Sequence, residues 1–190
     1  MIQYDAAKIR TGLPKYMNIM KLAKQSKDIS VDKDFQKAFK GFYLAGPMGN
    51  NWYDEFFKLF QEARDKNLSF EDVIDMFYDS TGRVELSFCS KMIHTIDPTK
   101  PIIDQYILWK FGFNTAQSYK DNPELAKMVY EDICEQYETH MNDTAVIDVL
   151  TRFDKDFPAY KNIEKIKKLD FIFWSLREFR IYSLLEYENK

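Results

Sequence analysis

The chain has 190 residues, of which 45% are hydrophobic, and a formal net charge of −3. Sixteen Phe and twelve Tyr stand against only six Gly and six Pro, which argues against a disordered chain and favours a helix-rich protein with an aromatic interior. No apolar stretch approaches the roughly 20 residues that a membrane helix requires, and two cysteines without a CxxC pair argue against a disulfide, zinc or iron–sulfur site. We therefore expect a cytoplasmic protein with no membrane contact.

Breaker residues divide the first part of the chain. Gly12-Leu13-Pro14 predicts the end of an N-terminal arm or short helix, and an amphipathic helix is expected over residues 15–27. Asp32 or Asp34 is expected to cap the next helix, which should end near Ala45. The following cluster, GPMGNN at residues 46–51, predicts either a connector or a flexible loop beside a site.

Helical periodicity returns at residues 52–66. Beyond it, Ser69 with Asp72 three residues later predicts the N-terminus of a helix that runs to about Tyr78.

The central stretch, residues 81–112, opens with a turn signal at Gly82 and continues with apolar residues at helical spacing from Val84. The resulting short core helix should end near Thr95, because two prolines follow shortly afterwards. Asp104 then stands directly before another apolar run, so its carboxylate is expected at or next to a helix N-terminus.

The last third of the chain also predicts helices. Asn122-Pro123 should begin one that reaches about Met141, and Asn142 or Asp143 should cap another that Pro158 closes. Residues 161–185 predict one long helix or two collinear ones. No strand pairs and no repeat are visible, so we expect an all-α bundle around the central helix. It is a single domain over residues 1–190, or two lobes, with a central lobe at about 50–150 and the terminal helices packed together.

The order of turn, buried helix, proline-bearing loop and aspartate resembles the helix-hairpin-helix DNA glycosylase superfamily. The segment GRVELSFCSK, followed by DPTKPIID, is similar in particular to sequences of an uncharacterised bacterial group with a degraded form of that motif. The resemblance covers most of the chain and implies a DNA-binding fold in which Asp104 is catalytic. It departs from the family at the lysine nucleophile, because counting back about eighteen residues from Asp104 reaches Leu86. The hairpin also has a single glycine, Gly82.

Two residues are candidates for catalysis. Asp104 could stabilise positive charge on a sugar or deprotonate a water, and the alternative is a plain N-cap. Lys91 is the nearest lysine in the central helix, and a buried lysine can attack a sugar carbon, although such a lysine is more often solvated or paired with an acid. His94 follows on the same helix and is more typical of a hydrogen-bonded structural residue.

Other candidates concern DNA itself. Under the resemblance, Gly82, Arg83, Ser87 and Ser90 would contact phosphates, whereas the alternative is an ordinary helix–helix turn. Trp52 and Tyr106, with Tyr53 beside Trp52, could stack on an extruded base, although aromatic residues at this density are more often core. The pair His140 and Asp143 indicates a metal only weakly, and no metal or other cofactor is expected.

Charge distribution bears on the partner. Residues 8–40 hold nine Lys or Arg against three Asp, whereas residues 121–156 hold ten acids against three bases. A basic N-terminal segment is compatible with DNA, although both regions could be simple solvated faces. The sequence therefore favours a DNA-binding or base-excision protein in which Asp104 assists cleavage of an N-glycosidic bond. The alternative is a non-catalytic helical interaction module derived from the same fold, and the oligomeric state stays open.

Overall fold

The computed structural model describes residues 2–43, 50–114 and 116–176, and within them the fold is entirely helical. The described helices, in chain order, are α1 (Ala6–Gln25), α2 (Lys33–Tyr43), α3 (Asn50–Lys66), α4 (Phe70–Thr81), α5 (Leu86–Ile96), α6 (Gln105–Lys110), η1 (Ala116–Tyr119), α7 (Pro123–His140), α8 (Thr144–Asp156), η2 (Pro158–Tyr160) and α9 (Lys165–Ser175). The predicted all-α class is confirmed. In this part of the chain no helix is both long enough and apolar enough to cross a lipid bilayer.

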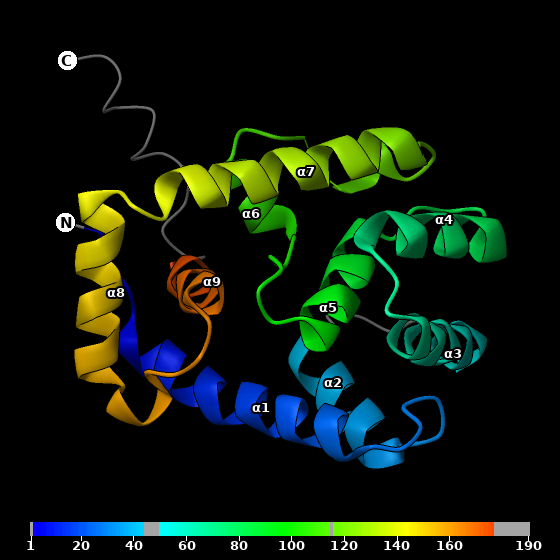
Figure 1. Ribbon diagram of the computed structural model, residues 1–190, viewed down its shortest axis with the longest axis horizontal. Helices are drawn as coiled ribbons and strands as arrows, with labels where there is room; N and C mark the ends of the chain where they lie inside the picture. The colour runs from blue at the N-terminus through cyan, green and yellow to red at the C-terminus, as the bar shows by residue number, and fades with distance from the viewer. Residues whose placement is uncertain (1, 44–49, 115, 177–190) are drawn as a thin grey trace.

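Helix α5 lies near the middle of the molecule (Figure 1), where it packs against α1, α4 and η1. Most of its side chains are buried, including Cys89, Met92 and Ile93. Helix α1 runs along one edge and contacts α2 and α9, while α9 also contacts α6 and α8. The first and last described helices are therefore neighbours, and together with α2 and α5 they surround the site described below.

Helix α1 overturns the prediction of a break at Gly12-Leu13-Pro14. It continues through Pro14, because one missing backbone donor costs less than exposing the apolar side chains that a single helix buries on both sides of it, among them Leu13 and Tyr16. Gly12 has a packing role instead. A Cβ at this position would lie 2.8 Å from Cε1 of Phe171, so glycine is what allows α9 to approach α1.

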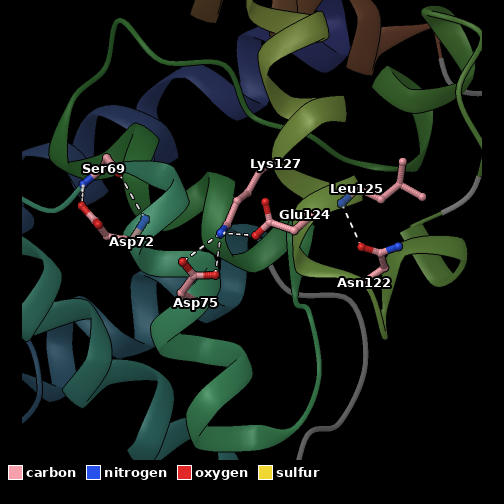
Figure 2. A network of polar contacts seen from close by, with 7 residues as sticks. All are labelled: Ser69, Asp72, Asp75, Asn122, Glu124, Leu125 and Lys127. Carbon is pink, nitrogen blue, oxygen red and sulfur yellow. Dashed lines mark hydrogen bonds and ion pairs between the residues drawn. The ribbon is translucent and has the colours of Figure 1, made fainter.

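Three predicted helix starts are confirmed by their caps. The Asp32 carboxylate accepts the N–H of Phe35 at 3.0 Å, Ser69 and Asp72 form the reciprocal capping box of α4, and the Asn122 side chain accepts the N–H of Leu125 at 3.0 Å. Figure 2 shows the last two caps on either side of an ion-pair network that joins α4 to α7. At the centre of that network, the Lys127 ammonium lies 2.7 Å from carboxylate oxygens of both Asp75 and Glu124.

The turn before α5 differs in detail from the prediction. Gly82 ends α4 in the left-handed conformation, φ 68°, which suits glycine because it has no Cβ. Helix α5 begins at Leu86 and ends at Ile96, so Val84 lies before the helix and not in its first turn. Val84 is nevertheless buried, and its N–H donates to the carbonyl of Lys120 at 2.8 Å. A contact with a distant segment thus replaces the first predicted helical turn.

Three further helix boundaries differ from their predictions or lie partly outside the described residues. Asp143 precedes α8 but its side chain makes no cap bond, because it pairs with His140 instead. Helix α3 begins at Asn50, inside the predicted loop, and the rest of that loop together with the predicted helix end at Ala45 lies outside the described residues. Of the helix predicted over 161–185, the structure describes α9, which begins later, at Lys165, and ends at Ser175; the part beyond residue 176 lies outside the described residues.

Candidate functional site

The segment between α5 and α6 positions Asp104, and two buried side chains of α5 fix its course. The Ser90 hydroxyl accepts the N–H of Ile103 at 2.9 Å. Nδ1 of His94 lies 2.6 Å from the carbonyl of Lys100, and because a carbonyl only accepts, Nδ1 carries the proton. Nε2 is then the acceptor for the Tyr16 hydroxyl, 3.1 Å away. The expectation of a structural histidine is confirmed.

Burial keeps His94 neutral. Removal from water lowers the pKa of its imidazole from 6.5 to about 3, and the positive charge of Lys167 adds to the effect. A neutral ring is required here, because an imidazolium has no lone pair at Nε2 to accept the hydrogen bond from Tyr16.

Asp104 is the N-cap of α6. Its Oδ1 atom accepts the N–H groups of Tyr106 at 2.9 Å and Ile107 at 3.1 Å. Both cap bonds use the same oxygen, and the residue also lines a pocket. Asp104 therefore caps a helix and lines a pocket at the same time, although the sequence presents a cap and a functional carboxylate as alternatives.

This pocket, called the central pocket below, has a volume of about 270 Å³. Its charged lining residues come from four parts of the chain: Lys15 from α1, Lys91 from α5, Asp104 before α6, and Lys167 and Asp170 from α9. Four aromatic side chains also line it, namely Phe42, Tyr43, Phe171 and Trp174, and the remaining lining residues are Thr11, Gly12, Gly41 and Ile102. The combination of aromatic walls with a few charged groups is typical of a small-molecule site.

Lys91 and Asp104 are thus brought to one pocket. The Lys91 ammonium donates to the carbonyl of Tyr43 at 3.0 Å and lies 5.4 Å from the centre of the Phe88 ring. Leu86, where the resemblance would place a lysine nucleophile, is 2% exposed and belongs to the core. Leu86 does not line the pocket, whereas Lys91 does.

Lys167 is the most deeply placed charge of the pocket, with 1% of its side chain exposed. Its ammonium forms an ion pair with Asp170, Nζ to Oδ2 2.6 Å. It also faces four aromatic rings, with centroids at 4.7 Å for Tyr16, 4.9 Å for Phe171, 5.4 Å for Tyr43 and 5.6 Å for Phe42. A charge in such surroundings depends on its partners, because desolvation of an unpaired ammonium costs several kcal/mol.

The residues of the turn before α5 form a separate surface, away from the lining of the central pocket. Gly82 and Arg83 are exposed, and Ser87 is partly buried. Arg83 lies 3.8 Å from the carboxylate of Glu85, whose pKa is raised by burial despite the nearby guanidinium. An acid beside the arginine weakens the attraction of this turn for phosphate.

Three predicted contact residues lie elsewhere. Ser90 is fully buried and its hydroxyl is bonded within the chain, which corrects its assignment as a DNA contact, because a buried group cannot reach a surface phosphate. Trp52 stacks on Phe56, with ring centres 5.4 Å apart and planes at 7°, so it extends the core. Tyr106 is 37% exposed on α6, with its ring edge-on to that of Trp109.

Lys167, Asp170 and Trp174 are pocket residues that the sequence did not single out. They lie at helical spacing in KIKKLDFIFWS, which looks like an ordinary amphipathic helix. The available signal was the KK pair inside an apolar run, because a helix that is apolar on most sides has little solvent-facing surface for two lysines. Both Lys167 and Lys168 are indeed buried.

The described residues contain no group of three or more His, Cys, Asp or Glu side chains that could hold a metal ion. His140 and Asp143 form an exposed pair, Nδ1 to Oδ2 2.8 Å. Comparisons with protein-family models, with curated proteins and with solved structures found no match.

Proposed function

We propose that the central pocket is the active site of a DNA base-excision protein that cleaves an N-glycosidic bond with the help of Asp104. The observation that carries this proposal is the convergence of Asp104 and Lys91, which the sequence singled out separately, on one aromatic-walled pocket. Chemistry on a base in a duplex requires the base to be extruded into such a pocket. A volume of about 270 Å³ lies just below the range of roughly 300–1,000 Å³ for drug-sized ligands and suits a single heterocycle.

In this mechanism Asp104 faces the sugar. As the bond between C1′ and the base breaks, positive charge develops on the sugar ring, and a nearby carboxylate stabilises it. A water molecule then attacks C1′ and gives a proton to Asp104. The cap bonds to Oδ1 hold the carboxylate in place, so its orientation does not have to be ordered during the reaction. This route requires no lysine nucleophile.

A second candidate is a non-catalytic interaction module that keeps the fold without the chemistry. It is favoured by the structural bonds that both residues already make. Asp104 caps α6, and the Lys91 ammonium binds the end of α2 through the carbonyl of Tyr43. A protein that needed these residues only for stability would show the same contacts.

Asp104→Asn separates the two functions, because asparagine caps a helix about as well as aspartate but carries no charge. We expect this variant to keep the wild-type unfolding transition and to lose base release from a panel of damaged-base oligonucleotides. Asp5→Asn is the matched control. Asp5 caps α1 through one oxygen at 2.9 and 3.1 Å, the distances found at Asp104, and it does not line the pocket. Wild-type protein that releases no base from any lesion would leave the interaction module as the better account.

A further inference from the structure

Lys167 lines the central pocket with a charge opposite to that of Asp104, and it has no part in the mechanism above. Its ammonium is enclosed by the rings of Tyr16, Phe42, Tyr43 and Phe171 and is held by Asp170. Each ring lies with the charge over its electron-rich face, and the carboxylate adds a full negative charge. The ring faces and the carboxylate are both partners for an ammonium, so Lys167 offers the pocket a cation and a hydrogen-bond donor.

The neighbouring lysine provides a comparison within the same helix. Lys168 is also buried, and its ammonium lies 2.6 Å from the Asp154 carboxylate. It also donates to the carbonyl of Lys161 at 2.7 Å and thereby ties α9 to α8 and to the segment that joins them. Lys168 has a structural role outside the pocket, whereas Lys167 lines it.

Tyr43 contributes a further polar group to the lining of the pocket. The hydroxyl of Tyr43 is buried and has no hydrogen-bond partner among the described residues. Burying such a group without a partner costs about 1–3 kcal/mol, and native proteins seldom retain such groups without a reason. Tyr43 lines the pocket, and the Lys167 ammonium lies over its ring, 5.4 Å from the ring centre, so the unsatisfied hydroxyl belongs to a residue in contact with Lys167.

We infer that Lys167 is a further catalytic residue of the proposed reaction, which stabilises the negative charge that develops on the departing base. This inference rests on the proposed function. When the bond between C1′ and the base nitrogen breaks, its electron pair goes to the base, and an ammonium among aromatic rings is well suited to bind that anion. Water supplies the hydroxyl to C1′, its proton goes to Asp104, and the base anion hydrogen-bonded to Lys167 takes up a proton from solvent. The positive charge that forms on the sugar is thus stabilised by Asp104, and the negative charge that forms on the base is stabilised by Lys167 from α9.

The charges that line the pocket agree with this division. Three lysines and two aspartates give its described lining a net charge of +1 at neutral pH. Asp104, between α5 and α6, faces the sugar cation, whereas Lys167 on α9 faces the base anion. The expected ligand is therefore a planar nucleobase that leaves as an anion. The pocket should bind the anionic form of such a base more tightly than its neutral form.

Binding of free bases tests this inference without requiring turnover. The probes are 5-nitrouracil, whose ring N–H is acidic enough for it to be an anion at neutral pH, and thymine, a neutral ring of similar shape. We expect isothermal titration calorimetry on the full chain to give the anion about tenfold higher affinity, the value of one charge-assisted hydrogen bond. Equal affinities, or no binding of either probe, would overturn the inference.

The variant of choice removes both charges together, Lys167→Met with Asp170→Asn, because removing one partner alone would leave a buried unpaired charge. It should lose the preference for 5-nitrouracil. The matched control is Lys168→Met with Asp154→Asn, which removes an ion pair of the same 2.6 Å length outside the pocket and should keep the preference. A folded Lys167 variant that still prefers the anion would contradict the assignment.

Base release distinguishes this inference from the proposed function. If the wild type binds the anion through Lys167 but releases no base from DNA, the anion site stands and the excision proposal fails. If the wild type releases a base and the Lys167 and Asp170 double variant does so at the same single-turnover rate, the excision proposal stands and Lys167 is not catalytic. A loss of about tenfold or more in that rate, with the Lys168 control unchanged, supports both.

Discussion

Asp5 and Asp104 cap their helices with the same geometry, yet only Asp104 lines a pocket. Capping geometry by itself therefore does not show whether an aspartate belongs to a functional site. What distinguishes Asp104 is the group of side chains around it, with Lys91 from α5 and the Lys167–Asp170 pair from α9. The same carboxylate serves as a helix cap and as a charged wall of the pocket.

The capping role gives a stability prediction for Asp104. Alanine cannot accept the two backbone N–H groups, so Asp104→Ala should lower the free energy of unfolding by about 1 kcal/mol, whereas Asp104→Asn should leave it nearly unchanged. Urea denaturation followed by circular dichroism measures both. A stability loss for asparagine as large as that for alanine would mean that the negative charge, and not the cap, holds this region.

Lys91 gives a prediction about mechanism. Because its ammonium is bound to the carbonyl of Tyr43 and the water route needs no amine nucleophile, we expect no covalent adduct with DNA when borohydride is added during turnover. Lys91→Ala is the control for any adduct that forms. An adduct given by the wild type and absent from this variant would replace the water mechanism with a lysine nucleophile.

His94 predicts a pH dependence of stability. Its pKa falls from 6.5 to about 3 on folding, so the unfolded chain binds a proton more readily, and the stability present above pH 6.5 is lost as the pH falls toward 3. Between pH 7 and pH 5 this group should lower the free energy of unfolding by about 2 kcal/mol. The difference in the free energy of unfolding between wild type and His94→Gln, measured by urea denaturation at both pH values, isolates the contribution of His94. A constant difference would show that His94 does not titrate on unfolding.

At the scale of elements, the contact between α1 and α9 is limited by one glycine. Gly12→Ala would place a Cβ 2.8 Å from the Phe171 ring, a wall of the central pocket. We expect a loss of about 1–3 kcal/mol, because buried overpacking forces side chains or backbone to shift. The thermal unfolding midpoint should fall accordingly.

Gly41→Ala is the matched control for that substitution. Gly41 lies inside α2, and a Cβ there would meet no atom within 4 Å. Alanine should therefore stabilise the protein by up to about 1 kcal/mol through its higher helix propensity. Equal effects of the two substitutions would show that the approach of α9 to α1 is not tightly packed.

At the scale of the whole molecule, charge limits how DNA could be bound. The chain is acidic overall, with a net charge of −3, while its basic excess lies in residues 8–40. We expect duplex DNA binding to be weak and to fade by physiological salt, because phosphate contacts release counterions and their affinity falls steeply with salt. Fluorescence anisotropy across a salt series measures this. Tight binding that persists at high salt would show that recognition does not rest on phosphate contacts.

Local patterns in the sequence determined the helical class and most helix starts of this protein. Asp32, Ser69, Asn122 and Asp104 were identified as caps because a cap depends on backbone groups only two or three residues away. The buried face of α5 followed from its periodicity for the same reason. Pro14 was misread as a break, since the burial that carries α1 through it depends on distant helices.

Only the tertiary structure decided which residues share the central pocket. Lys91 and Asp104 are close in sequence, but Lys167 and Asp170 come from a helix more than sixty positions away and resemble any amphipathic pattern until α9 packs against α1. That packing depends on side chains from both helices, such as Gly12 against Phe171, and no local pattern encodes it. The caps are local properties of the chain, whereas the pocket and its charges exist only where the helices meet.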